Sequence, residues 1–474
     1  MVTIPRLVIA APGSAHGKTS VTTGLLAALR SRGMTVSPHK VGPDYIDPGY
    51  HALAAGRVGR NLDPWLVGEE RIAPLFVHGA LTPTLADIAV VEGVMGLFDG
   101  VADRPGFAST AHVASLLTAP VVLVVDAAAV GRSVAALVHG FVTFDPSVRI
   151  GGVIFNRVGT DRHRRILRDA LDETGVPMLG AIARHEGLQT PSRHLGLIPA
   201  AERSAEARRT VSDLAEVVGA AVDLDRIVEL ARTAPDLEVE EWVAPATAGP
   251  ETRPVIAIAG GPAFTFSYAE TAELLSAAGA DVVTFDPIAD SELPVGTAGL
   301  VIGGGFPEIH ADALSSNVAL RSEIVDLVAA GAPVAAECAG LLYLVSGLDG
   351  APMCDVVDAT AQMTQRLTIG YREAVAASDS PLIASGTRMR GHEFHRTACA
   401  PSHGERAAWV WSVPGDGELP TRVTEGFVTG PTSNVHASYL HLHWAGTPDI
   451  AARFVAAAVA ARRAADVSAG GVRR

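Results

Sequence analysis

A glycine-rich segment near the start of the chain places a lysine and a threonine in a pattern typical of phosphate binding. The segment APGSAHGKTS lies between an apolar run, Arg6–Ala10, and an Ala/Leu-rich run, Ser20–Arg30. Strand, glycine loop, Lys-Thr and helix is the P-loop order, in which backbone amides cradle phosphates, the lysine neutralises them and the threonine can bind Mg²⁺. Three residues separate the two loop glycines instead of the usual four, so a plain glycine-rich turn is the alternative. We predict a nucleotide-binding loop formed by Gly13, Gly17, Lys18, Thr19 and Ser20.

Lysine is almost absent from the chain. Lys18 and Lys40 are the only two among 37 Lys and Arg residues. A composition rich in Ala, Gly and Val and poor in Lys indicates GC-biased coding, so a retained lysine can mark a need for an ammonium group, which Arg does not replace. The neighbours of Lys18 favour that interpretation, whereas chance survival is a fair interpretation of Lys40.

Polar residues follow several predicted strands of the first half. Glu92 comes directly after Ile88–Val91, and the segment KVGPDYIDPGYH follows the second strand. An open α/β sheet forms its site beyond the carboxyl ends of its strands, and carboxylates beside a P-loop suit Mg²⁺. Singly, each acid is more often a loop residue or a helix cap, but together they favour a site. The residues are Asp44, Asp47, Glu92, Asp99 and Asn156.

The second half carries a candidate thiol nucleophile. Cys338 lies between a predicted strand, Pro333–Ala336, and a predicted helical run, Leu341–Leu348. We expect the helix N-terminus to lower the pKa of this thiol and the turn to present amides to an oxyanion. Burial as a structural cysteine is the alternative, which we apply to Cys354 and Cys399. The predicted oxyanion donors are Gly304, Gly305 and Ala339.

A cysteine nucleophile needs a base, and two histidines far downstream are candidates. His441 and His443 lie two residues apart in ASYLHLHW. In an extended segment both point the same way, so one can meet the thiol and the other can support or border it. We predict His441 as the base and His443 as its support.

The elements that must position these residues alternate between short apolar strands and Ala/Leu-rich helices. Such alternation predicts an α/β fold with parallel sheets covered on both faces. A stretch rich in Pro, Glu and Thr interrupts the pattern, and no internal repeat register is visible. We therefore predict two different doubly wound domains: a P-loop domain over 1–235, a linker over 236–253, a second domain over 254–446, and a C-terminal helix and tail over 447–474.

Composition narrows the class of protein. The 474 residues are 48% hydrophobic and 19% charged, with a net charge of −14. An acidic chain is a poor candidate for binding nucleic acid or anionic membranes. The most apolar stretch, Leu116–Val125, is too short to span a bilayer, and three cysteines cannot build a disulfide framework. We expect a cytoplasmic protein with no nucleic-acid or membrane partner.

Seven motifs in order resemble the cobyrinic acid a,c-diamide synthases and their aerobic counterparts, the hydrogenobyrinic acid a,c-diamide synthases. The motifs are APGSAHGKTS, KVGPDYIDPGYH, VVEGVMGLFDG, PSRHLGLIP, GGGFPEIHADALSSN, AAECAGLLYL and ASYLHLHW. The match runs from Leu7 to about Ala445. The first half is similar to dethiobiotin-synthetase-like P-loop proteins, and the second resembles a class I, triad-type glutamine amidotransferase domain.

The resemblance implies an enzyme that uses ATP, Mg²⁺ and glutamine to amidate two carboxylates of a corrinoid ring. Cys338 would release ammonia from glutamine through a thioester, with His441 as base. Triad amidotransferases carry a Glu two residues after this His, where the chain has His443, so a triad and a dyad both remain open. The Gly that usually lies two residues before the nucleophile is Ala336 here.

For the first half, the resemblance implies an acyl phosphate made from ATP. Lys18 would steady the β and γ phosphates, and Asn156 would contact adenine. The implied Mg²⁺ ligands are Thr19, Asp47 and Glu92. The implied substrate contacts are Asp44, Tyr45 and Asp99, with Arg193 and His194 as weaker candidates.

Three alternatives compete with this interpretation. Cobyric acid synthase shares the two-domain plan, but KVGPDYIDPGYH and PSRHLGLIP point away from it. A dethiobiotin-synthetase-like carboxylase leaves Cys338 without a role, and a ParA-like scaffold with an inactive amidotransferase domain would not need both the thiol and its base. The GC-rich coding favours hydrogenobyrinic over cobyrinic acid by association alone, and a homodimer remains open.

Overall fold

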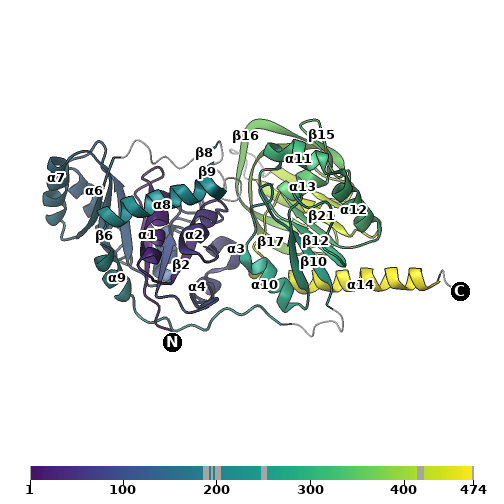
Figure 1. Ribbon diagram of the computed structural model, residues 1–474, viewed down its shortest axis with the longest axis horizontal. Coiled ribbons are helices and arrows are strands. Elements are labelled where there is room, and N and C mark those ends of the chain that lie inside the picture. Colours follow the sequence, from purple (N-terminus) through teal and green to yellow (C-terminus); the bar gives the residue numbers. More distant parts are fainter. Residues whose placement is uncertain are drawn as a thin grey trace. The chain divides into compact units, whose positions relative to one another are not determined.

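The chain folds into two compact units, Met1–Val243 and Ala244–Arg474 (Figure 1). This computed structural model describes residues 2–184, 192–193, 196–197, 204–246, 253–413 and 421–471. Each unit contains a mainly parallel sheet with helices, so the predicted α/β class is confirmed. Within the described ranges, no helix is both long and apolar enough to cross a membrane.

The first unit is built on seven parallel strands in the order β3-β2-β4-β1-β5-β6-β7. The predicted strand Arg6–Ala10 is found unchanged, and the predicted strand Ile88–Val91 is one residue longer, ending at Glu92. The strands are β1 (Arg6–Ala10), β2 (Val36–Val41), β3 (Arg60–Leu62), β4 (Ile88–Glu92), β5 (Val121–Asp126), β6 (Ile150–Val158) and β7 (Met178–Ala183).

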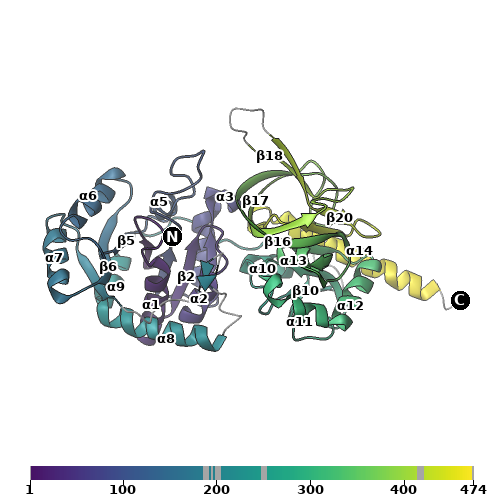
Figure 2. The same ribbon diagram turned by 90° about the horizontal axis from the view of Figure 1, so that it is seen from above.

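Helices cover both faces of this sheet. Figure 2 shows α1, α2 and α8 on one side and α5 and α6 on the other, as right-handed crossovers between parallel strands require. Gly24 permits the close approach of α1 to α8, because a Cβ there would lie 2.5 Å from Val218. The helices are α1 (Lys18–Ser31), α2 (Asp47–Ala55), α3 (Pro64–Val67), α4 (Ile72–Leu81), α5 (Thr110–Leu116), α6 (Val134–Phe144), α7 (Asp161–Asp172), α8 (Ser204–Ala221) and α9 (Leu224–Arg232), with the 3₁₀ turn η1 (Glu69–Arg71) and a small hairpin of β8 (Ser192–Arg193) and β9 (Gly196–Leu197).

Part of the predicted linker packs onto the first unit. The backbone of Leu237 pairs with Val2, with N···O distances of 3.0 and 3.1 Å. The amide of Trp242 donates to Pro74, and its ring lies 5.1 Å from His78, edge to face.

The second unit is built on a six-stranded sheet in the order β11-β10-β12-β13-β21-β20. All neighbours are parallel except the pair of β20 and β21. Its strands are β10 (Val255–Ala259), β11 (Asp281–Phe285), β12 (Thr297–Ile302), β13 (Val334–Glu337), β20 (Phe427–Thr429) and β21 (Val435–Ser438). Its helices are α10 (Ala269–Ala277), α11 (Ala311–Ser316), α12 (Val318–Ala329), α13 (Ala339–Leu344) and α14 (Asp449–Gly471), with the 3₁₀ turns η2 (Pro307–His310) and η3 (Trp444–Gly446).

A second sheet in this unit was not predicted. The expected helix over Leu341–Leu348 ends at Leu344, and Val345–Leu348 becomes a strand that pairs with β16. Val, Ser and Gly at positions 345–347 are weak helix formers, so pairing decides their conformation. The sheet contains β14 (Val345–Leu348), β15 (Ala351–Pro352), β16 (Val357–Ala376), β17 (Arg388–Ala400), β18 (Trp409–Val413) and β19 (Thr421–Glu425).

Candidate functional site

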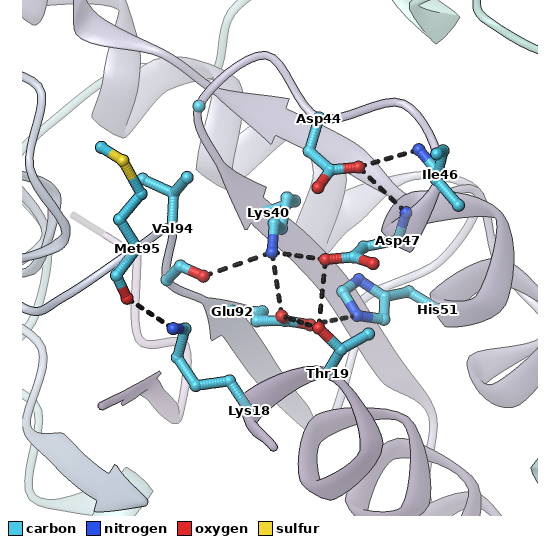
Figure 3. Close-up of polar contacts among 12 residues, drawn as sticks. Lys18, Thr19, Lys40, Asp44, Ile46, Asp47, His51, Glu92, Val94 and Met95 are labelled. Atoms are coloured by element: carbon cyan, nitrogen blue, oxygen red, sulfur yellow. Dashed lines mark hydrogen bonds and ion pairs between the residues drawn. The ribbon is translucent and has the colours of Figure 1, made fainter. Parts of the chain in front are cut away.

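The P-loop leads into the N-terminus of α1. Gly17 has φ of 89°, in the left-handed region, and a Cβ there would lie 2.3 Å from the side-chain amide of Asn156. That amide donates to the carbonyl of His16 at 3.0 Å, so Asn156 closes over the loop. The Lys18 ammonium contacts the carbonyl oxygen of Gly13, at 3.3 Å. It also contacts the carbonyl oxygen of Met95 (Figure 3). The first amides of a 14-residue helix have no partner within the helix and suit a phosphate.

The three predicted Mg²⁺ ligands lie together at the ends of different elements. Thr19 Oγ1, on α1, is 2.7 Å from Glu92 Oε1 and 3.2 Å from Asp47 Oδ2. Glu92 ends β4 and Asp47 begins α2. Figure 3 shows these side chains converging on one point, as expected for groups that follow neighbouring parallel strands.

Lys40 lies at the centre of this cluster, and its interpretation as a chance survivor was wrong. Its ammonium is 2.6 Å from Asp47 Oδ2 and 2.8 Å from Glu92 Oε1, and it donates to the Gly93 carbonyl at 3.2 Å (Figure 3). The residue is 3% exposed. Burial disfavours the charged ammonium, but the two carboxylates outweigh it, so the pKa of Lys40 lies above its ordinary value. The scarcity of lysine was the signal that pointed to this residue.

Both carboxylates have unusual environments. Burial and Asp44 raise the pKa of Asp47 to about 7, against the opposing effect of Lys40. Burial also disfavours the charge of Glu92, but Lys40 and His51 outweigh it and hold its pKa well below the usual range. His51 Nε2 lies 2.6 Å from Glu92 Oε2, so the second oxygen of this carboxylate is held as well.

This set of oxygens fits Mg²⁺. The Thr19 hydroxyl and two carboxylates are hard ligands, and the Lys40 ammonium held between Asp47 and Glu92 shows that the position favours positive charge. Among the described residues, no group of three or more His, Cys, Asp and Glu side chains is arranged to hold a metal ion. Mg²⁺ at nucleotide sites takes one or two carboxylates and completes its shell with phosphates and water.

The predicted substrate contacts do not lie in one cluster of mutual hydrogen bonds as the predicted Mg²⁺ ligands do. Asp44 lies in the turn before α2, where its Oδ1 accepts hydrogen bonds from the amides of Ile46, at 2.8 Å, and Asp47, at 3.1 Å. Asp99 accepts from the Gly96 amide at 2.9 Å, and Tyr45 is buried. Arg193 lies in β8 but its side chain is outside the description, and His194 lies outside the described residues.

In the second unit, Cys338 occupies a sharp turn between β13 and α13. Its φ of 49° is uncommon for a residue with a side chain, as at the strand-to-helix turns that expose nucleophiles. Its amide donates to Ser438 at 2.7 Å. The expected lowering of the thiol pKa is wrong: burial and Glu308 raise the pKa of Cys338 far above its usual value, and the Ala339 amide opposes this only in part. Burial therefore favours the neutral thiol of Cys338.

The three predicted oxyanion donors lie in different surroundings, and one of them is already bonded. The Gly304 amide already donates to the Phe266 carbonyl at 3.0 Å, so its predicted role is corrected. Gly305 lies in the same loop and has no room for a side chain, because a Cβ there would be 2.0 Å from the Ala263 carbonyl. The Ala339 amide faces the thiol of Cys338. Gly305 and Ala339 remain the predicted donors.

The two histidines have different surroundings. The backbone of His441 pairs with His392, at N···O distances of 2.9 and 3.0 Å, and its ring packs against Gly304, where a Cβ would lie 2.5 Å from Cε1. Burial and two neighbouring histidines lower the pKa of His441, which favours the neutral form of the ring. His443 instead stacks on Tyr268 at 4.0 Å, with Nε2 3.8 Å from Glu270.

Comparisons with known proteins agree with this division. Residues 7–198 match the CobQ/CobB/MinD/ParA nucleotide binding domain, and residues 255–448 match the CobB/CobQ-like glutamine amidotransferase domain. A hydrogenobyrinate a,c-diamide synthase from Streptomyces coelicolor is 56% identical, covering 95% of this chain and 97% of the relative. Another, from Thermobifida fusca, is 53% identical, covering 96% and 97%. A cobyrinate a,c-diamide synthase from Synechococcus is 41% identical, covering 95% and 98%. The chain therefore belongs to the family of hydrogenobyrinate and cobyrinate a,c-diamide synthases, ligases with a glutamine amidotransferase domain.

Proposed function

We propose that this protein amidates the a and c side-chain carboxylates of hydrogenobyrinic acid, using ATP and glutamine. The observation that carries the choice of ring is the difference in identity: relatives named for hydrogenobyrinate are 53% and 56% identical, whereas relatives named for cobyrinate are 40% and 41% identical. Each amidation consumes one ATP and one glutamine.

Glutamine supplies the nitrogen at the second unit. Cys338 loses its proton to His441, and its sulfur attacks the carboxamide carbon of glutamine. Ammonia leaves with that proton, and water then hydrolyses the thioester to glutamate. Support comes from the sheet, in which the Cys338 amide bonds to Ser438, three residues before His441. The amides of Gly305 and Ala339 would hold the oxyanion.

The first unit activates the ring carboxylate. One carboxylate oxygen attacks the γ phosphorus of ATP, giving an acyl phosphate and ADP, and ammonia then attacks the acyl carbon and displaces phosphate. A carboxylate resists ammonia until one oxygen becomes such a leaving group. Mg²⁺ held by Thr19, Asp47 and Glu92 would neutralise phosphate charge.

The two lysines would share the phosphate charge. Lys18 contacts the carbonyl of Gly13 in the loop, and Lys40 is held between Asp47 and Glu92, the proposed Mg²⁺ ligands. We assign Asp99 and Tyr45 to the ring carboxylate, and Asn156, which closes over the loop, to the base. Asp44 would act mainly by holding the turn before α2.

A paired assay tests this proposal. The purified protein receives MgATP, glutamine and either hydrogenobyrinic or cobyrinic acid, and the ring is examined by mass spectrometry. Two successive exchanges of OH for NH₂, faster with the metal-free ring, are expected. Faster amidation of the cobalt ring would overturn the choice of substrate. No amidation of either ring, with glutamine hydrolysis intact, would overturn the proposed function.

A further inference from the structure

A histidine base needs a group that orients its ring and stabilises the charge it gains. In triad enzymes a carboxylate at imidazole Nδ1 does both and leaves Nε2 to take the proton of the nucleophile. In this chain, the position two residues after the base holds His443, which contacts Tyr268 and Glu270. Any carboxylate for His441 must therefore come from elsewhere in the fold.

Such a carboxylate lies beside the ring. Glu337 Oε2 is 3.9 Å from Nδ1 of His441. Glu337 ends β13 and immediately precedes Cys338. Across the sheet it pairs with Ser438 of β21, so the two neighbouring strands deliver the acid and the base to the same place.

Two donors that follow His441 in the chain fix the Glu337 carboxyl. It accepts hydrogen bonds from the Leu442 amide and from the Trp444 side chain. The Glu337 side chain is 17% exposed and that of His441 is 1% exposed, so the pair is shielded from water. A carboxylate tied to the residues that flank the base holds its position relative to that base.

The other ionisable groups around these residues do not supply the same charge. His392 and His395 act on His441, and both are bases that oppose its protonation. Glu393 is bound by Arg372 at 2.6 Å. Glu308 acts on the thiol of Cys338 and disfavours the thiolate.

From this geometry we propose that Glu337 is the positioning carboxylate of the His441 base. This role rests on the proposed hydrolysis of glutamine at Cys338. When the thiol passes its proton to Nε2, the Nδ1–H of the imidazolium donates to Glu337. The separation exceeds a hydrogen bond by about 1 Å, and catalytic hydrogen bonds tighten once substrate binds. Nε2 then returns the proton to the departing ammonia.

The charge of Glu337 gives the role a signature in the pH profile. Burial raises the pKa of this carboxyl to about 8, although the hydrogen bonds from Leu442 and Trp444 lower it. The anion that stabilises the imidazolium therefore forms as the pH rises toward 8. We expect kcat/KM for glutamine hydrolysis to rise along a limb centred near that pH, because this parameter reports the free enzyme.

The test compares three variants of the full chain. Glu337→Gln should lower kcat for glutamine hydrolysis by about 100-fold or more with little change in KM. The rise of kcat/KM toward pH 8, the limb of the profile, should disappear. Glu337→Asp should recover part of the rate and keep the limb. Trp444→Phe keeps the carboxyl but removes one hydrogen bond that lowers its pKa, so the limb should move to higher pH. Hydrogen exchange in peptides from β13 and β21 checks that the second unit of each variant folds, and amidation with added ammonium checks the first unit.

The outcomes separate the two levels of the proposal. Continued glutamine hydrolysis by Cys338→Ala would overturn the proposed function itself. If Cys338→Ala is inactive with glutamine but Glu337→Gln retains wild-type kcat and pH profile, only the role of Glu337 fails. If Glu337→Gln does not fold, Trp444→Phe decides: a limb that stays in place or moves to lower pH overturns the role.

Discussion

The two lysines allow a matched test of the electrostatics at the nucleotide site. Lys40 lies between two buried carboxylates, whereas Lys18 contacts carbonyl oxygens and its pKa is lowered by burial and by Lys40. Replacing each with Met removes one ammonium and preserves much of the side chain. Lys40→Met leaves Asp47 and Glu92 as neighbouring buried charges without their cation.

The expected loss of stability depends on the charges that remain after each substitution. Removing one partner of a buried ion pair costs about 3–5 kcal/mol, because the remaining charge is unpaired. For a unit of this size that corresponds to a fall in Tm of about 6–20 °C. Lys18→Met loses hydrogen bonds, but it also removes a buried charge and its repulsion with Lys40. We therefore expect the free energy of unfolding to change by less than about 1 kcal/mol. Both variants should lose ATP-dependent amidation.

The free energy of unfolding of each unit is measured by urea unfolding, followed by hydrogen exchange and mass spectrometry. Peptides from β4 report the first unit, and peptides from β13 provide an internal control that should not change. Adding Glu92→Gln to Lys40→Met should recover part of the loss, with a coupling energy of about 0.5–3 kcal/mol. Equal stability of the two lysine variants, or no recovery in the double variant, would refute the reasoning.

The remaining predictions concern the second unit. Cys338→Ala should abolish amidation with glutamine but keep it with added ammonium; equal loss with both donors would contradict the division of labour. Gly304→Ala places a Cβ 2.5 Å from Cε1 of His441, so glutamine hydrolysis should fall at least about tenfold while ammonium-dependent amidation persists. Burial lowers the pKa of His436 to about 4, below about 6.5 in the unfolded chain, so its contribution to stability is lost as the pH falls from 6.5 toward 4. The free energy of unfolding of the wild type should fall by about 2 kcal/mol between pH 6.5 and 5, and His436→Asn should remove this fall. Urea unfolding measures it, and an unchanged dependence of this free energy on pH in the variant would contradict the reasoning.

Sequence patterns predicted the parts of the fold that depend on local apolar runs. Arg6–Ala10 is a strand with the expected bounds, because it is a short apolar segment that ends at turn-forming residues. Strand ends also predicted that Thr19, Asp47 and Glu92 lie together. The order of strands in a parallel sheet brings such residues to one edge whatever the details of packing.

What the sequence did not predict depends on tertiary contacts. The scarcity of lysine pointed to Lys40, but its partners could not be predicted, because the two carboxylates lie 7 and 52 positions away in the chain. The pKa of Cys338 rises because burial outweighs the turn, and burial is a property of the packed fold. Glu337 escaped notice beside the nucleophile, since only the pairing of β13 with β21 brings it to His441.

The most direct test of the account follows the nitrogen. The protein is incubated with MgATP, hydrogenobyrinic acid and glutamine labelled with ¹⁵N in its amide, and the ring is analysed by mass spectrometry. The account predicts a diamide in which both new nitrogens carry the label, and no labelled product with Cys338→Ala. An unlabelled diamide, or a ring that stays unamidated while glutamine is consumed, would contradict it.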